Sequence, residues 1–121
     1  EAHVGTLREL VDRVAESEPR AHVHIEVRES YRNMGPVIER NPRVVEAAFE
    51  AMRRVGVEPM TAITRGGTDG SALSAMGLPT PNLFTGGQDY HSVKEWASVQ
   101  DMAAAAATIV ELAGVWAEPL P

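Results

Sequence analysis

From residue 41 onward, glycine and proline residues mark where helices and strands begin and end. Their positions constrain the fold more than any other feature of the sequence. Asn41 followed by Pro42 is typical of a helix start, with Asn41 as the N-cap, and Gly56 is a suitable helix end. Five segments are predicted in this order: a helix from residue 41, a strand over 60–64, a short helix over 72–76, a strand over 82–85 and a helix after Ser98. Helices that alternate with short apolar strands indicate an α/β fold with parallel strands.

Apolar residues at helical spacing predict which sides of the two longer helices face a core. In the first of them these residues are Val44, Val45, Ala48, Phe49 and Met52. Ser98 followed by Asp101 resembles a capping box at the start of the last helix. The predicted core residues of that helix are Met102, Ala105, Ile109, Leu112 and Trp116.

The first 40 residues have a different character. Helical spacing over 6–18 ends at Pro19, and strict alternation over 21–28 predicts a strand with one buried and one solvated face. Residues 30–40 lack periodicity and are predicted to be a connector. One strand is not a sheet and two barely form one, so we expect this sequence, which begins with Glu1, to be a piece of a longer protein.

Composition and charge exclude several classes of function. The formal net charge is −6 and the Arg residues are scattered along the chain, which argues against a basic nucleic-acid-binding protein. With no cysteine, the chain has no disulfide, thiol nucleophile or zinc-thiolate site, and this fits a reducing compartment. The apolar stretch over 102–110 is far shorter than the about twenty residues that span a bilayer. We therefore expect a cytoplasmic protein whose partners are neither nucleic acid nor a membrane.

The glycine-rich segment RGGTDG, residues 65–70, follows a predicted strand and precedes a predicted helix. Paired glycines let a backbone approach a ligand closely, and amides at a helix N-terminus favour an anion. The guanidinium of Arg65 would add a bidentate partner for a carboxylate. The segment matches neither a P-loop nor a dinucleotide fingerprint, so an anion-binding turn and an ordinary tight turn both stay open.

The polar loop after the second predicted strand carries a further candidate, His91. A loop with His, Asp and Glu after a buried strand lies where α/β proteins place active sites. Neutral imidazole is a zinc ligand, and Asp89 or Glu95 would accept the other ring proton and fix the tautomer. The local sequence also accommodates an ordinary hydrogen-bonded loop histidine.

Two other groupings carry less weight. His22 and His24 share one face of the strand predicted near the N-terminus, but no third ligand is suggested nearby, and we interpret them as part of a solvated face. Ser71 with His91 and an aspartate would make a serine-hydrolase set. No G-x-S-x-G elbow surrounds Ser71, however, and it falls inside a predicted helix start.

Taken whole, residues 65–96, RGGTDGSALSAMGLPTPNLFTGGQDYHSVKEW, resemble the C-terminal signature of the di-zinc metallopeptidases, in their peptidase T (aminotripeptidase) branch. RGGTDG and GGxDYH at this separation, joined by MGLPTPN, carry the resemblance. SYRNM (30–34) and NPRVVEAAFEAMRRVGVEP (41–59) resemble the preceding segments of that family in the right order. The resemblance covers nearly the whole chain, although residues 1–20 match only in pattern.

The resemblance implies an α/β catalytic domain that is interrupted by an inserted α+β lid domain. Residues 1–33 would then be the C-terminal part of the lid, its last helix and strand. Residues 34–121 would be the C-terminal part of the catalytic domain. The parent enzyme would remove the N-terminal residue from short peptides, tripeptides in particular, and this piece alone would be inactive.

The resemblance also implies two zinc ions that polarise the scissile carbonyl and activate a shared water, with a Glu as general base. One family ligand matches within this chain, His91, and no catalytic residue lies in it. Asp89 and Glu95 would be carboxylates that support the ligand or its loop. Four residues would contact the bound peptide: Arg65, Gly66, Gly67 and Thr68.

Two positions depart from the family pattern: Lys94, where a histidine is frequent, and Ser92, which is often glycine. They leave the preferred peptide open. The expected partners are a short peptide, the upstream remainder of the same enzyme and a second copy bound through the lid. The alternatives are a non-catalytic lid or association module, a truncated pseudo-enzyme, and a related zinc deacylase or carboxypeptidase.

Overall fold

A computed structural model describes residues 2–64 and 66–118 of the chain. The chain divides into two units, Glu1–Ser30 and Tyr31–Pro121, which are described separately. This division falls close to the predicted one between residues 33 and 34, while the assignment of the two parts to a lid and a catalytic domain stays a prediction. None of the helices in the described part is long and apolar enough to cross a membrane.

The first unit contains helix α1, Ala2–Ser17, in which no described residue is buried. The strand predicted over 21–28 is wrong, because residues 21–30 adopt no regular secondary structure. A strand persists only while its N–H and C=O groups pair with a neighbour, and the described part of this unit has no second strand. Val23 and Val27, which the alternation predicted to be buried, are about half exposed.

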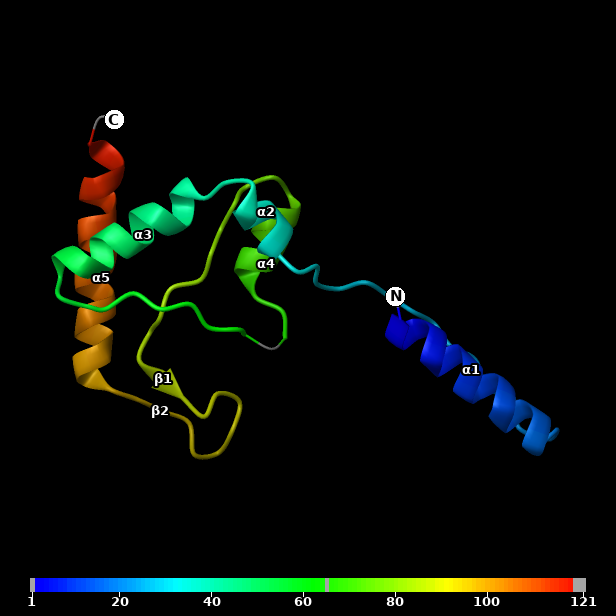
Figure 1. The fold of residues 1–121 in the computed structure, drawn as a ribbon. Helices are drawn as coiled ribbons and strands as arrows, with labels where there is room; N and C mark the ends of the chain where they lie inside the picture. The colour runs from blue at the N-terminus through cyan, green and yellow to red at the C-terminus, as the bar shows by residue number, and fades with distance from the viewer. Residues whose placement is uncertain (1, 65, 119–121) are drawn as a thin grey trace. The chain divides into compact units, whose positions relative to one another are not determined.

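Helices of the second unit occupy the positions predicted for them (Figure 1). They are α3 (Arg43–Arg54), α4 (Asp69–Ala75) and α5 (Val99–Ala117). Gly56 and Gly77 follow the C-caps of α3 and α4 with φ of +77° and +97°, which only glycine adopts freely. An additional short helix, α2 (Gly35–Glu39), lies in the segment that was predicted to be a connector, and there the Asn33 side chain accepts the Gly35 N–H at 2.8 Å.

Asn41 does not cap α3, contrary to the prediction. Pro42 holds the N-cap position, and no side chain caps the helix. The Asn41 amide group Nδ2 instead donates to the carbonyl of Val37 at 2.8 Å. The carbonyls at the end of α2 have no partner within that helix, and Asn41 satisfies one of them.

The strands predicted over 60–64 and 82–85 are also absent. The described sheet is a single antiparallel pair, β1 (Gly87–Gln88) and β2 (Trp96–Ala97), with Gly87 opposite Ala97 and Gln88 opposite Trp96. Parallel strands need neighbours in the same sheet, and the two predicted segments do not pair with each other. The result is a helical structure with a small sheet, which is compatible with part of an α/β domain.

Helix α3 lies across α5, and their contact forms the core of the second unit (Figure 1). The buried side chains of the two helices are mostly small: Ala47, Ala48, Ala51 and Met52 on α3, and Ala105 and Thr108 on α5. Small side chains on both helices let the two backbones approach closely. The Thr108 hydroxyl is satisfied within its own helix, because it donates to the Ala104 carbonyl at 2.9 Å.

The predicted core face is confirmed for α3 and largely wrong for α5. All five residues predicted for α3 are buried or half-buried. On α5, Met102, Ile109 and Trp116 are 51%, 58% and 43% exposed, whereas Ala105 is buried and Leu112 is half-buried as predicted. The small-residue face of α5 contacts α3 because it permits the closer approach. Trp116 stacks at the edge of the contact, 4.5 Å from the Arg43 guanidinium.

Arg54, the last residue of α3, forms ion pairs that link this helix to α5. Its guanidinium donates to Glu118 at 2.9 Å, to Glu111 at 3.2 Å and to Glu50 of its own helix at 2.9 Å. The hydrogen bond from Arg54 holds the pKa of the Glu118 carboxyl below its usual range, and the same is true of Glu50. These groups are accessible to solvent, so the cluster orients the two helices more than it stabilises them.

We expect Ala51→Leu to lower the free energy of unfolding by about 1–3 kcal/mol. Ala51 has no exposed surface, so a larger side chain must displace one of the two helices. Ala103→Leu, at an exposed position of α5, is the matched control and should change that free energy by less than about 0.5 kcal/mol. Urea denaturation followed by circular dichroism measures both. Equal effects of the two substitutions would contradict the packing of α3 on α5.

Candidate functional site

The hairpin that carries His91 is anchored to the start of α5. Gly86 precedes β1 with φ of +83° and is buried, and its carbonyl accepts the Ser98 N–H at 2.9 Å. A Cβ atom on Gly86 would lie 2.8 Å from the Cβ of Asp101 and 3.0 Å from the nitrogen of Met102. The Ser98 side chain accepts the Asp101 N–H at 3.2 Å, which confirms Ser98 as the cap; the second bond of a capping box is absent, because the Ser98 N–H donates to Gly86. A glycine is needed here both for the backbone conformation and for the close approach to the helix.

The loop between β1 and β2 is closed by its own hydrogen bonds. The Ser92 N–H donates to the Asp89 carbonyl, and the Glu95 N–H donates to the Ser92 carbonyl, each at 3.2 Å. The Ser92 hydroxyl oxygen accepts the Lys94 N–H at 3.0 Å. Across the loop, Oε2 of Glu95 accepts the His91 N–H at 3.0 Å. These bonds make the loop a series of tight turns.

Asp89 and His91 have an unusual backbone conformation for residues with a side chain. Their φ angles are +52° and +65°, and no other non-glycine residue in the described part of the chain has a positive φ. This left-handed region costs a non-glycine residue about 1–3 kcal/mol, and such residues concentrate at functional sites. Asp and His are among the residues that tolerate it best. The loop therefore combines a candidate ligand with locally strained backbone.

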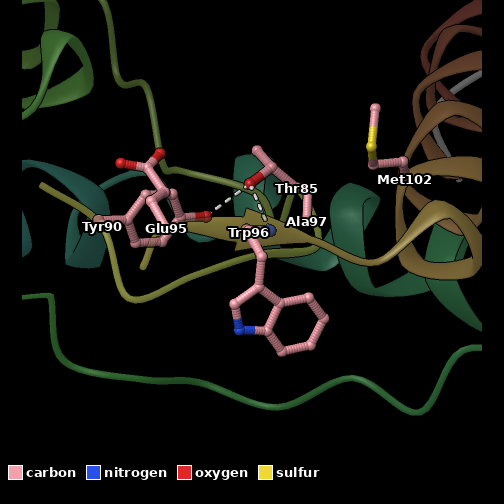
Figure 2. A pocket seen from close by; sticks show the side chains of 7 residues that line it. Thr85, Tyr90, Glu95, Trp96, Ala97 and Met102 are labelled. Atoms are coloured by element: carbon pink, nitrogen blue, oxygen red, sulfur yellow. Dashed lines mark hydrogen bonds between the residues drawn. The ribbon is translucent and has the colours of Figure 1, made fainter. Parts of the chain in front are cut away.

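An open pocket of about 570 Å³ lies beside this loop (Figure 2). The residues that line it are Thr85, Gly87, Tyr90, Glu95, Trp96, Ala97 and Met102. Within it, Oγ1 of Thr85 shares a hydrogen bond of 2.7 Å with the Tyr90 hydroxyl and accepts the Gly87 N–H at 3.4 Å. His91 is not among the lining residues. The pocket thus has a largely apolar wall and one carboxylate, that of Glu95.

The glycine-rich segment is described only in part, because Arg65 lies outside the described residues. Gly66 is exposed with φ of +98°, and among the described residues other than its chain neighbours no atom lies within 4 Å of where its Cβ would be. The backbone of Gly67 packs directly on the ring of Tyr31, so a Cβ at this position would overlap the ring. Tyr31 was not identified from the sequence as part of this region, and its place in SYRNM was the available signal.

Thr68 is the N-cap of α4 and serves as a hydrogen-bonding centre. Its Oγ1 accepts the Ser71 N–H and an N–H of the Asn82 side chain, each at 3.2 Å. The Ser71 hydroxyl lies 3.2 Å from the same oxygen, and Ser71 is buried. The contacts of Ser71 suit a structural serine. Asn82, which sequence reasoning missed, connects the start of α4 to the segment that follows that helix.

The described residues offer one imidazole at the hairpin but no complete metal site. No group of three His, Cys, Asp or Glu side chains in the described part lies close enough to hold a metal ion. His91 is exposed, and Glu95 accepts a hydrogen bond from its backbone N–H. Imidazole nitrogen suits zinc, so His91 fits the role of one ligand, whereas this donor set alone does not make a site.

The glycine-rich turn, the short helix and the anchored hairpin with His91 all lie within the part of the chain that a family model matches. The chain belongs to peptidase family M20/M25/M40, whose model matches residues 1–114. Several similar proteins are named peptidase T. The chain is 43% identical over 112 residues to peptidase T of Geobacillus sp. (strain WCH70) and 47% identical over 103 residues to that of Shouchella clausii (strain KSM-K16).

These two matches cover 93% and 85% of this chain, but 27% and 25% of the relatives. Peptidase T of Parabacteroides distasonis is 44% identical over 106 residues, which are 88% of this chain and 26% of that protein. The predicted resemblance to peptidase T is therefore confirmed. The chain spans about a quarter of the length of the curated relatives that it matches.

We expect Gly86→Ala to destabilise the chain more than Gly77→Ala does. Both glycines have positive φ, so both substitutions cost about 1–2 kcal/mol through the backbone. A Cβ on Gly77 would meet nothing within 4 Å, whereas one on Gly86 would press on the first turn of α5. Urea denaturation of the two variants gives the difference, which should be at least about 1 kcal/mol. Equal losses would show that the hairpin is not seated on α5 as described.

Proposed function

We propose that the chain is the C-terminal portion of a di-zinc aminopeptidase that removes the N-terminal residue from short peptides, tripeptides in particular, in the cytoplasm. One observation carries this proposal. In a chain of a peptidase family, an exposed histidine lies on a hairpin anchored to α5, with its backbone in the left-handed region. The names of the similar proteins, peptidase T, support the same function.

In this proposal His91 supplies one zinc ligand through a neutral imidazole nitrogen. The other ligands and the general base come from parts of the parent outside this sequence. Bound zinc would supply a Lewis acid and a water of lowered pKa. The task of this chain is to present His91 in a fixed direction, and the hydrogen-bonded loop supports that task.

The glycine-rich segment is proposed to contact the peptide. Arg65 would bind a carboxylate of the substrate, because a guanidinium matches a carboxylate bidentately and cannot be a metal ligand. The backbone of Gly66 is open on the side where a side chain would stand, whereas Tyr31 covers that side of Gly67; this packing and the capping by Thr68 hold the segment in shape. An extended peptide could then lie along this backbone.

The isolated piece is proposed to be inactive, since a zinc site needs at least three protein ligands and this chain offers one. Residues 1–33 are proposed to belong to the lid. The larger apolar side chains Leu7, Leu10 and Val14 of α1 are about half exposed, which supports an interaction of α1 with the upstream remainder of the enzyme or with a second copy.

His91→Ala in the complete parent enzyme should remove one of two bound zinc ions and lower kcat/KM by more than about a hundredfold. Removing a residue that hydrogen-bonds to a metal ligand lowers metal affinity or activity roughly 10–100-fold, and removing the ligand itself should have a larger effect. Metal analysis by mass spectrometry and tripeptide turnover measure the two effects. His24→Ala, an exposed histidine of the first unit, is the control and should change neither. Two retained zinc ions and normal turnover in His91→Ala would refute the proposed role.

A further inference from the structure

We infer that Glu95 is a positioning residue for His91, and that it acts on the His91 backbone and not on the imidazole ring; this inference rests on the proposed function. The observation is the hydrogen bond of 3.0 Å from the His91 N–H to Oε2 of Glu95. Through this bond the carboxylate holds His91 in the left-handed conformation that determines where its side chain points.

The bond has the features that such a role needs. A carboxylate that accepts a backbone N–H makes a charge-assisted bond, which is about twice as strong as a neutral one. Glu95 immediately precedes β2, whose first residue, Trp96, pairs with Gln88 of β1. The acceptor therefore belongs to the fixed end of the hairpin, while the residue that it holds lies in the loop.

The backbone on the other side of His91 is held as well. The Tyr90 hydroxyl is hydrogen-bonded to Thr85, and both residues line the pocket that Glu95 also lines (Figure 2). Asp89 is fixed by accepting the Ser92 N–H. Residues 90 and 91 lie inside the turn that the Asp89–Ser92 bond closes, and the carboxylate of Glu95 adds to this turn a contact on the His91 N–H itself.

The left-handed conformation of His91 has to be supported from outside the residue, because φ of +65° is unfavourable for a residue with a Cβ atom. Without the Glu95 acceptor, the His91 N–H would lose its partner and the residue would relax toward negative φ. The imidazole would then be displaced from the direction in which the folded loop presents it. A ligand that samples several directions binds its metal less tightly, because ordering it costs entropy.

Three variants of the complete parent enzyme test this inference. Glu95→Ala removes the acceptor, and Glu95→Gln keeps an oxygen that accepts the N–H but removes the charge. Lys94→Ala is the control, because it changes a neighbouring side chain and keeps the Lys94 backbone N–H that donates to Ser92. Zinc affinity is measured by competition with a chelator. Exchange of the His91 amide hydrogen is measured by NMR on the zinc-free protein.

We expect Glu95→Ala to lower the affinity for one zinc ion by about 10–100-fold and to speed exchange of the His91 amide hydrogen by at least about tenfold. Glu95→Gln should restore zinc affinity to within about threefold, because it keeps an acceptor for the N–H. Lys94→Ala should match the unaltered enzyme in both measurements.

The outcomes separate this inference from the proposed function. If His91→Ala loses a zinc ion while Glu95→Ala keeps both with unchanged affinity, the positioning role is wrong and the proposed function stands. Equal weakening by Glu95→Ala and Glu95→Gln would overturn the inference in favour of a requirement for charge. Weaker zinc binding in Glu95→Ala with unchanged exchange of the His91 amide would also overturn the inference. If His91→Ala keeps both zinc ions, the proposed function fails and this inference fails with it.

Discussion

The contact between the small side chains of α3 and α5 supports most of the second unit. Buried alanines on both helices let them approach closely, and Arg54 reaches from the end of α3 to Glu111 and Glu118. Gly86 packs closely against the first turn of α5, and its carbonyl accepts the N–H of Ser98, the N-cap of that helix. The position of the hairpin therefore depends on α5. The two residue pairs of the sheet hold the strands of the hairpin together but do not place it.

The loop at the end of that hairpin is polar, so it is held by hydrogen bonds instead of apolar packing. Glu95 and the backbone of Asp89 and Ser92 supply these bonds, and together they keep His91 in a conformation that it would not adopt alone. Under the proposed function this has a purpose, because a metal ligand must be presented in one direction. The strain in the loop is balanced by an acceptor four residues away in the sequence.

Much of the helical structure could be predicted from the sequence, because helices depend on local signals. Gly56 and Gly77 end helices as expected, and Ser98 caps α5. The strands could not be predicted in the same way, since a strand depends on partners that may lie anywhere in a protein, and the segments 21–28, 60–64 and 82–85 find none here. The sequence pattern also misjudged the face of α5, because bulky apolar residues score highest for burial although the alanines allow the closest contact.

For the candidate site, the sequence proposed residues, whose roles stay predictions, and did not foresee their contacts. The resemblance singled out His91, Glu95 and Thr68, but not that Glu95 binds a backbone N–H or that Thr68 caps α4. The central claim is that this chain contributes one ligand to a site that other parts of a peptidase complete. Tripeptide turnover by the purified 121-residue chain, with zinc added and contaminating peptidase excluded, tests it most directly. We expect no turnover, and measurable turnover by the chain alone would show that it holds a complete site.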